Sequence, residues 1–443
     1  MTMKNTKGIV NLSPPRFLLG IFVIFILLGT MLLKLPIATN EHISVLDSLF
    51  TATSAMTVTG LIVVDTGSVF TIFGQVVILL LIQVGGLGIM TFAVVIFLMI
   101  GRKIGVKERL IVTQALNQTS VGGVIELVKR LFLFSVILEG IAFLLLSLRW
   151  IPSLGWKEGA YASFFHAISA FNNAGFSIWE NSLSDYVGDP VINIVISFLF
   201  IIGGLGFTVI FDIWKKGNPS NLSLHTKLMI LGTFAVNLVS LLVIFILEYD
   251  NPGTLSNLTG LDKLQAAYFQ AVTPRTAGFN TIDIGSMNDS TLFFTILLMF
   301  IGAGSASTGG GIKLTTFLAL IFAVFAFLKE HDEVVVFRRA IEYKTIVRAL
   351  AITVIGMLLI VVGIFFLNIT EDASFISIVF ETVSAFGTVG LSTGLTGHLT
   401  WMGKVVIILI MLIGKVGPLT LAFSFAHSSK ANIRYPKEDL LTG

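Results

Sequence analysis

The sequence predicts an all-α, polytopic membrane protein built from four repeats, and three observations carry this prediction. The chain is 55% hydrophobic and only 12% charged, whereas soluble domains carry about 25% charged residues. Its apolar runs approach or exceed the length of about 20 residues that a spanning helix needs. A short pattern that ends in glycine recurs four times between these runs. The composition excludes a soluble enzyme, and the lack of cysteine excludes disulfides and thiolate metal sites.

We expect eight spanning helices, in the apolar runs 17–33, 71–100, 131–148, 190–213, 228–247, 291–328, 346–367 and 402–426. The first run follows Lys4, Lys7 and Arg16, as the apolar core of a signal peptide would. It is longer than such a core, and the sequence after it, Lys34 to Ala38, has no clear small-x-small cleavage site. We therefore expect a retained helix.

The charges of the connections predict the orientation. The connections at about 101–130, 214–227 and 329–348 are basic, and the alternate connections are acidic. Lys and Arg accumulate on the cytoplasmic side of a membrane protein. The prediction is therefore a multi-pass protein of the cell membrane with both termini in the cytoplasm.

Four acidic segments carry the repeated pattern. Each has an aromatic residue ten positions before its glycine, and three share Ser-Ala at one offset. The strings are Phe50–Leu61, Phe165–Phe176, Tyr268–Phe279 and Phe380–Leu391. A second glycine follows 24–28 residues after the first, at Gly85, Gly203, Gly302 and Gly414. Self-similarity at a near-constant period is a strong architectural signal.

The predicted unit is a helix, a pore half-helix of about 12 residues, an extended filter strand and a second helix. We divide the chain into repeat 1 (1–100), repeat 2 (101–216), repeat 3 (217–328) and repeat 4 (329–443, with the C-terminal tail). A half-helix is too short to span, and non-helical backbone at membrane depth lines an aqueous cavity or is buried in protein. Four such hairpins predict four quarters around one central pore.

The four residues that end at each repeated glycine form what we term the filter segments. They are Thr57, Val58, Thr59 and Gly60; Asn172, Asn173, Ala174 and Gly175; Arg275, Thr276, Ala277 and Gly278; and Gly387, Thr388, Val389 and Gly390. They hold no paired carboxylates and no His cluster. Glycine permits positive φ, so rows of carbonyl groups can face an axis and replace the water shell of a potassium ion. One such glycine alone is more simply an ordinary turn, but four at matched positions favour an ion filter.

The sixth apolar run contains a glycine-rich break. Five glycines and several hydroxyl residues lie between Gly302 and Gly311, and a glycine costs a helix interior up to about 1 kcal/mol relative to Ala. The helix should open there, beneath the filter. Lys415, in the last apolar run, is a cation in an apolar environment and is a functional candidate by default. A lysine that reaches to the membrane surface or pairs structurally is the alternative.

With these strings in place, the sequence resembles the membrane subunits of bacterial Ktr potassium-uptake systems, in the Trk/Ktr/HKT superfamily. The resemblance covers nearly the whole chain and rests on the four filter strings, on Thr273–Phe279 and on the Gly304–Gly309 loop. It implies one key glycine in each filter segment and an intramembrane gate over 302–316. The implied gate residues are Gly302, Gly304, Ser305, Ser307, Thr308, Gly309, Gly310, Gly311, Lys313 and Lys415. The family often has Arg where this chain has Lys415, which puts any bidentate contact there in doubt.

Four other features have simpler interpretations. The run from Glu330 to Glu333 could be a metal cluster but is more simply a solvated loop. His166 and Glu381 occupy matching positions on two half-helices. A structural role is expected for His166, while Glu381 could also add negative potential near the entrance. Arg275 should point away from the axis and hold its filter segment from behind.

The expected function is potassium uptake, with a secondary solute carrier as the alternative and an intramembrane enzyme as a remote third. By resemblance, the partners are a second copy of the chain and a cytoplasmic ring of RCK-type, nucleotide-binding subunits that resemble those of Ktr systems (KtrA-like). The lipid bilayer surrounds the chain, and we expect no nucleic acid and no organic cofactor on it. The basic inner loops and the tail from His427 to Gly443 are candidate docking surfaces. Potassium against sodium preference, coupling to sodium and the opening stimulus stay open.

Overall fold

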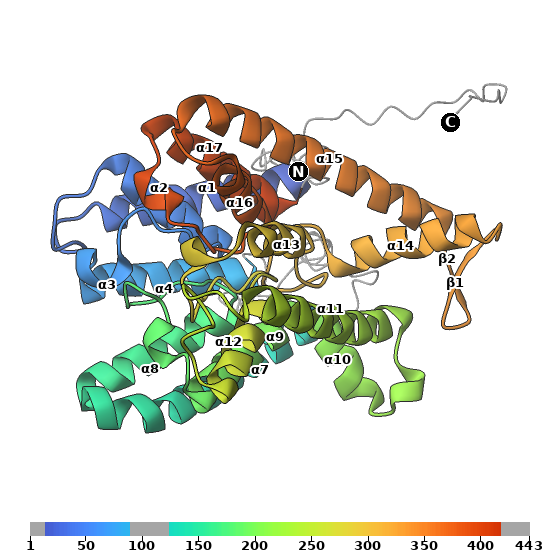
Figure 1. Cartoon of the computed structure of the whole chain (residues 1–443), viewed down its shortest axis with the longest axis horizontal. Helices are drawn as coiled ribbons and strands as arrows, with labels where there is room; N and C mark the ends of the chain where they lie inside the picture. Colours follow the sequence, from blue (N-terminus) through green and yellow to red (C-terminus); the bar gives the residue numbers. More distant parts are fainter. Residues whose placement is uncertain (1–13, 89–123, 418–443) are drawn as a thin grey trace, which may run out of the picture.

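The computed structural model describes residues 14–88 and 124–417 and is almost entirely helical (Figure 1). The helices are α1 (Pro14–Leu33), α2 (Val45–Thr57), α3 (Thr66–Val69), α4 (Ile72–Leu87), α7 (Val124–Leu154), α8 (Trp156–Phe171), α9 (Pro190–Leu205), α10 (Phe207–Lys216), α11 (Leu224–Glu248), α12 (Gly260–Val272), α13 (Asp289–Phe300), α14 (Leu314–Leu328), α15 (Tyr343–Thr370), α16 (Phe375–Gly387) and α17 (Trp401–Val416). Short 3₁₀ turns lie at Ser184–Tyr186, Pro219–Asn221, Ile284–Ser286 and Leu395–His398. The proposed orientation of the termini, the tail from His427 and most of the basic loop 101–130 fall outside the described residues.

Three described helices, α7, α11 and α15, are long and apolar enough to cross a membrane. The pair α9 and α10, bent by 89° at a short break, makes a fourth if it is one span. Large apolar side chains on these helices face outward, and Leu148, Phe234 and Ile246 are 76%, 67% and 71% exposed. Such surfaces are stable in lipid and costly in water. The count of eight spans stays a prediction.

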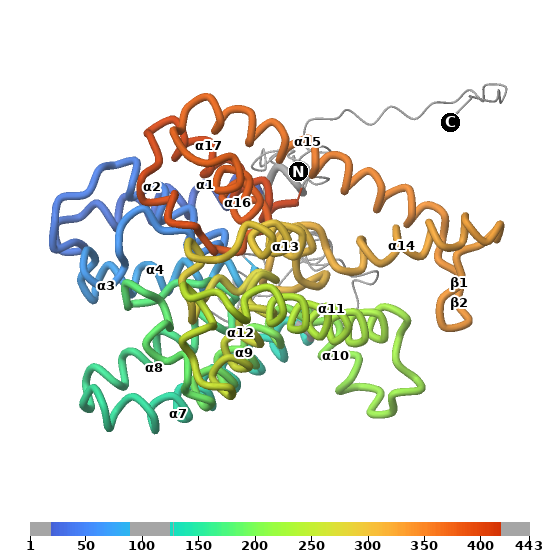
Figure 2. Tube along the Cα trace, viewed as in Figure 1, coloured from blue at the N-terminus to red at the C-terminus, as the bar shows by residue number. Residues whose placement is uncertain are grey.

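The chain runs round the molecule and returns to its starting point. The colours of Figure 2 pass from blue through green and yellow to red, and the red helices lie beside the blue ones. Helix α17 packs against α2. At this contact Lys404 Nζ donates a hydrogen bond to Asp47 Oδ1 at 2.7 Å, across 357 residues of sequence. This ion pair joins repeat 4 to repeat 1.

The second glycine of three repeats lies where a helix meets the end of a half-helix. A Cβ atom at Gly85, Gly203 or Gly414 would collide with a half-helix carbonyl oxygen. The oxygens are those of Met56, Phe171 and Phe386. In repeat 3 the matching Gly302 instead meets the carbonyl of Gly310 in its own loop. These glycines therefore allow the second helices to approach the half-helices closely.

In repeats 1, 2 and 4 a helix ends at a glycine with positive φ, and in repeat 2 the helix α10 follows directly after that glycine. Helices α4, α9 and α17 end at Gly88, Gly206 and Gly417, with φ of 83°, 97° and 92°. Each lies three residues after a second glycine. A non-glycine residue is strained at such angles. In repeat 3 the break is longer, from the end of α13 to the start of α14, and agrees with the expected position.

One hairpin departs from the all-α prediction. Strands β1 (Val334–Val336) and β2 (Arg339–Ile341) pair antiparallel between α14 and α15. Three successive valines favour an extended chain, which the prediction of a basic connection over 329–348 did not include. The filter segments, expected as extended strands, are instead turns and irregular chain at the ends of the half-helices, and they belong to no sheet among the described residues.

Substitution of Gly414 by Ala tests the close approach of α17 to the half-helix α16. We expect a loss of about 1–3 kcal/mol of stability, because the new methyl group overpacks against the Phe386 carbonyl. The measurement is the thermal unfolding midpoint in detergent. Gly140→Ala on α7 is the matched control, since nothing lies within 4 Å of the added atom. Equal midpoints for the two variants would contradict the packing argument.

Candidate functional site

The filter segments leave their half-helices through a common hydrogen-bond pattern. In repeats 1, 2 and 4 two successive backbone N–H groups of the segment donate to carbonyls of the last helical turn. The bonds are Val58 to Ala55 (3.1 Å) and Thr59 to Ser54 (2.8 Å), Asn173 to Ala170 (3.0 Å) and Ala174 to Ser169 (2.8 Å), and Thr388 to Ala385 (3.2 Å) and Val389 to Ser384 (2.9 Å). Repeat 3 departs from this pattern, because Arg275 N, the first residue of its segment, donates to Val272 O (3.4 Å) and Ala277 N donates to Thr273 O (3.0 Å).

The backbone of each segment alternates in handedness. The residue two before each glycine has positive φ, as does the glycine itself, and the residue between them does not. The non-glycine residues are Val58 (58°), Asn173 (58°), Thr276 (75°) and Thr388 (50°). Positive φ is costly for a β-branched residue, so three of these four positions carry strain. Strain held at matched positions is typical of functional backbone.

The carbonyl groups of these segments lack hydrogen-bond donors. The two residues before each glycine are completely buried. Their carbonyl oxygens accept no hydrogen bond from a residue that the structure describes. More than nine in ten buried carbonyls in proteins have a donor. Eight buried carbonyl groups without a donor, two in each of the four segments, indicate sites for a cation or ordered water.

The four segments form a closed ring. A Cβ atom at Gly60 would collide with the carbonyl oxygen of Ala174 and lie 3.1 Å from Cα of Gly175. The same atom at Gly175 would lie 2.9 Å from Cα of Gly278, at Gly278 it would meet the Val389 carbonyl, and at Gly390 the Thr59 carbonyl. The contacts thus pass from each repeat to the next and return to the first. Only glycine fits at these positions, since each also has a φ between 67° and 92°.

Half-helix hydroxyl groups fix the segments from the outside, and the sequence analysis assigned them no role. Gly60 N and Gly390 N donate to Oγ of Ser54 (3.1 Å) and Ser384 (3.2 Å). In repeats 2 and 3 the hydroxyl groups of Ser169 and Thr273 donate to the carbonyls of Phe176 (2.7 Å) and Phe279 (2.5 Å). The shared Ser-Ala pair was the available signal.

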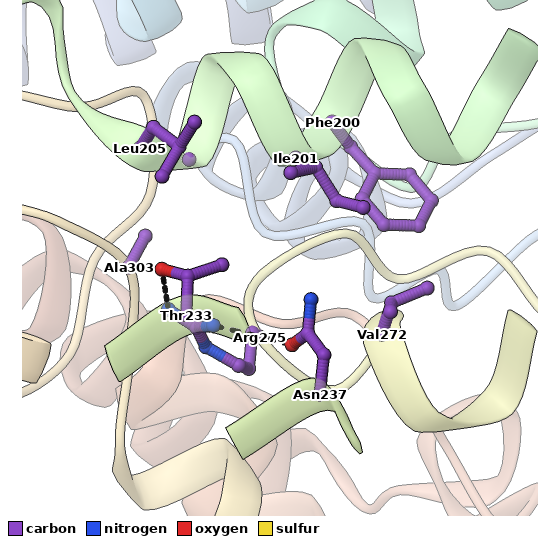
Figure 3. Close-up of a pocket in the computed structure, with 9 residues that line it drawn as sticks. Phe200, Ile201, Leu205, Thr233, Asn237, Val272, Arg275 and Ala303 are labelled. Carbon is purple, nitrogen blue, oxygen red and sulfur yellow. Dashed lines mark hydrogen bonds between the residues drawn. The ribbon is translucent and has the colours of Figure 1, made fainter. Parts of the chain in front are cut away.

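The first residue of two segments points away from the ring. Arg275 is 8% exposed and donates to Asn237 Oδ1 (3.2 Å) and Thr233 Oγ1 (3.4 Å), both on α11. Figure 3 shows these bonds beside a small cavity of about 20 Å³ between α9, α11 and the loop after α13. Asn172 likewise contacts Gln83 on α4 and Glu139 on α7. These two side chains lie behind the filter segments; the ion-binding role predicted for their backbone stays a prediction.

The gate loop (302–316) contacts the filter segments directly. Thr308 Oγ1 donates to Asn173 Oδ1 at 2.9 Å, and Asn173 Nδ2 donates to Thr276 Oγ1 at 3.2 Å. Gly310 N donates to Thr388 Oγ1 at 2.8 Å. Three of the four non-glycine residues with positive φ, Asn173, Thr276 and Thr388, therefore bond to the loop or to a residue that does. The loop begins with Gly302 N bonded to the Ile312 carbonyl (2.8 Å).

Two lysines donate to the carbonyl groups of the same loop. Lys313 Nζ bonds to Gly309 O at 2.7 Å and to Gly310 O at 3.4 Å. Lys415 Nζ, from α17, bonds to the carbonyl of Thr308. Neither forms an ion pair with a carboxylate of the described residues. Their ammonium groups therefore donate hydrogen bonds to backbone carbonyl oxygens of the loop, close to the ring.

The remaining gate-loop residues bridge to repeat 2. Gly304 N donates to the Gly204 carbonyl (2.8 Å), and Phe207 N donates to the Ala306 carbonyl (2.9 Å). Ser305 and Ser307 bond within the loop, to Thr315 (3.4 Å) and to the Gly304 carbonyl (2.6 Å). A Cβ atom at Gly309 or Gly310 would crowd the hydroxyl of Thr276 or Thr388. Gly311 has a φ of 67°.

His166 and Glu381 make structural contacts behind their filter segments. His166 bonds to Ala162 O (2.8 Å) and Ser177 Oγ (3.1 Å) and stacks on Trp179 with ring centroids 4.2 Å apart. Tyr186 joins this cluster, and its partial burial raises the pKa of the phenol, with smaller contributions from Asp185 and Asp189.

Glu381 is buried and accepts from Thr393 N (3.2 Å) and Thr396 Oγ1 (2.7 Å) and from the hydroxyl of Ser392. It thereby holds the connection after the fourth segment. The run from Glu330 to Glu333 is exposed and belongs to no metal-ligand cluster among the described residues.

Comparison with known proteins decides the family. The sequence model of the TrkH family, described as a cation transport protein, matches residues 21–435. The chain belongs to the TrkH family of cation transport proteins. This is a transport family, so the protein is not an enzyme, and within the family it is of the Ktr type.

Relatives of the TrkH family match over the full chain. The Ktr system potassium uptake protein B of Bacillus subtilis (strain 168) is 58% identical, with 100% of both chains covered. Its counterpart in Vibrio alginolyticus is 42% identical, over 97% of this chain and 95% of that one. The potassium/sodium uptake protein NtpJ of Enterococcus hirae is 38% identical, with both chains fully covered.

A solved structure supports the fold. The potassium transporter TrkH from Vibrio parahaemolyticus superimposes with a TM-score of 0.75 at 22% identity, covering 96% of this chain and 87% of that one. This similarity extends to the fold alone.

Replacement of Ser384 by Ala tests the hydroxyl group that anchors the fourth filter segment. The N–H of Gly390 loses its acceptor, and an unpaired buried donor costs about 1–3 kcal/mol. We expect a lower unfolding midpoint than for the matched control Ser163→Ala, whose hydroxyl bonds only to its own helix at Gly159 O. A Ser384 variant as stable as the control would show that the anchor is dispensable.

Proposed function

We propose that this protein is the membrane subunit of a Ktr-type system and takes potassium into the cell through the ring of four filter segments. The observation that carries the proposal is the set of buried carbonyl groups without donors at matched positions of all four segments. Carbonyl oxygens of this kind substitute for the hydration shell of a monovalent cation. The transported ion is potassium, as in the names of the Bacillus subtilis and Vibrio alginolyticus relatives.

The direction of transport follows from the membrane potential. A single positive charge that crosses inward gains about 2.3 kcal/mol per 100 mV. No energy-coupling site is needed for uptake on this scheme. The ion sheds its water among the carbonyls of Thr59, Ala174, Ala277 and Val389 and leaves past the gate loop.

The gate loop and Lys415 form the barrier. In this conformation the ammonium groups of Lys313 and Lys415 hold loop carbonyls that a passing potassium ion would need. A unit charge about 4 Å from another costs about 4 kcal/mol at an effective dielectric constant of 20. The two lysines therefore oppose passage both by occupying ligands and by repulsion.

The proposed assembly is a homodimer in the cell membrane with a cytoplasmic, RCK-type nucleotide-binding ring. The support is the Ktr-type relationship, since the relatives are named as proteins of a Ktr system. The exposed cations Arg338, Arg339 and Lys344 lie around the β1–β2 hairpin and the start of α15. They are a candidate docking surface for that partner.

Sodium is the alternative ion, and the name of the Enterococcus hirae relative includes both cations. Glycine at all four ring positions favours potassium over sodium. A secondary solute carrier is the alternative mechanism, but such folds place a solute site at the midplane of two inverted repeats. The small cavity beside Arg275, about 20 Å³, is far below the size of a solute site.

Substitution of Gly278 by Ser tests the filter. The side chain would meet the Val389 carbonyl at a φ of 78°, so the ring must deform. We expect rubidium uptake in proteoliposomes to fall at least about tenfold, or its selectivity over sodium to weaken by that factor, since about 1.4 kcal/mol lost in ion binding suffices.

The matched control for this filter test is Gly394→Ser. Gly394 has a φ of 96° but open space around it, so it carries the same backbone strain without touching the ring. Uptake should be measured with and without a candidate cytoplasmic partner. Absence of cation flux in both preparations of the unmutated protein would overturn the proposed function.

Lys415 is tested by its replacement with Met. We expect faster rubidium uptake without the partner, by about tenfold or more, because both the charge and the bond to Thr308 O are lost. Lys415→Arg keeps the charge and should stay slow. If the Met variant were as slow as the unmutated protein, the barrier would lie elsewhere.

A further inference from the structure

A polar cluster behind the second filter segment has no role in the scheme above. It joins Gln83 of α4, Glu139 of α7 and Asn172 at the C-cap of α8. Asn172 Nδ2 donates to Gln83 Oε1 at 2.7 Å, and Gln83 Nε2 donates to the two oxygens of Glu139 at 3.1 and 3.4 Å. Each amide thus donates to the next group, and the carboxyl group of Glu139 is the last acceptor.

The inner end of the cluster is built into the fold, whereas Gln83 and Glu139 are half-buried. A Cβ atom at Gly86 would collide with Oδ1 of Asn172, so α4 leaves space for this side chain by having glycine there. Asn172 is completely buried. Residue 172 is followed directly by Asn173 and Ala174, whose carbonyls belong to the ring. A displacement of Asn172 therefore displaces the filter.

The surroundings of Glu139 disfavour a charged carboxylate. No cation of the described residues forms an ion pair with it. The nearest basic residues along α7, Arg130 and Arg149, are nine and ten positions away, or about 14–15 Å at the rise of an α-helix. The C-terminal end of α8 carries a partial negative charge, which repels an anion. An unpaired charge at membrane depth is costly.

The hydrogen-bond inventory agrees with a neutral acid. Asn172 Nδ2 also donates to Ile168 O at 2.9 Å, while Asn172 Oδ1 is buried without a partner among the described residues. The amide hydrogens of Asn172 and Gln83 are fewer than the acceptor oxygens around them. A protonated Glu139 adds one further donor to the cluster.

We propose that Glu139, as a neutral acid, is a positioning residue that fixes the second filter segment through Gln83 and Asn172 and thereby sets the selectivity of the ring. Repeat 3 offers an internal parallel, because Arg275 occupies the position of Asn172 and bonds to Thr233 and Asn237 on the first helix of its own repeat. The effect on selectivity rests on the proposed function, whereas the neutral acid and its coupling to Asn172 do not.

The first experiment compares Glu139→Gln with Glu139→Ala in potassium and sodium flux assays on proteoliposomes. Gln retains an acceptor oxygen, so its potassium-to-sodium ratio should stay within about twofold of the unmutated protein. Ala removes the acceptor, and the ratio should fall about fivefold or more, the scale of one lost buried hydrogen bond. Val136→Ala, on an exposed position of the same helix, is the control and should leave the ratio unchanged.

Two outcomes of the flux assay overturn the proposal. If Ala leaves the ratio unchanged, Glu139 does not position the filter. If Gln lowers the ratio as much as Ala, the charge of a carboxylate is what matters, for example as a ligand of sodium.

The second experiment needs no flux. Infrared spectroscopy should show the carbonyl stretch of a protonated acid that disappears in Glu139→Gln. Thermal midpoints of Glu139→Ala, Asn172→Ala and the double variant should be non-additive, since the residues share one network. Additive midpoints or the absence of the band would refute the coupling or the neutral acid even if the protein transported no potassium.

Discussion

Backbone carbonyl groups at membrane depth impose the constraint on which the rest of this structure depends. Lipid offers them no hydrogen-bond donor, and the described protein offers none to the carbonyls of Val58, Thr59 and their counterparts in the other repeats. Such groups persist only where the surrounding structure holds them in place. Half-helix hydroxyls anchor each segment, positive φ turns its backbone, and glycines on the second helices let α4, α9 and α17 support the half-helices closely.

The filter segments of the four repeats share this backbone arrangement. They differ in the contacts that the side chain of their first residue makes behind the ring. In repeat 1, Thr57 bonds back to its own half-helix at Thr53 O (2.7 Å), and in repeat 4 the corresponding residue is Gly387, with no side chain. In repeats 2 and 3 the corresponding side chains extend outward to the first helix. The ring is therefore fourfold in its main chain and asymmetric in its support. The polar contacts with a first helix occur in repeat 3, which contains the gate loop, and in repeat 2 before it.

The features that could be predicted from the sequence are those that appear as a repeat or as a change in hydropathy along the chain. The four strings, the segment glycines and the break after α13 follow from spacing and composition, and the TrkH family assignment agrees with the resemblance that they showed. The contacts of Asn172 with Gln83 and Glu139 join residues that are 89 and 33 positions apart. No local sequence pattern predicts a contact over such a separation. The helix ends at Gly88, Gly206 and Gly417 had a signal in the sequence, a Gly-x-x-Gly spacing. Its meaning depends on a φ angle that only the folded chain shows.

The filter and the gate loop are not separable elements. Asn173, Thr276 and Thr388 contribute carbonyls to the ring, while their side chains bond to the loop or to one another. Withdrawal of the loop breaks the bonds of Thr308 and Gly310, each worth about 1 kcal/mol net, and leaves strained residues with fewer contacts. The total of a few kcal/mol is close to the coupling energies of about 1–3 kcal/mol that effectors supply. An effector that supplies a coupling energy of this size suffices to move the loop, and any such movement also changes the geometry of the ring.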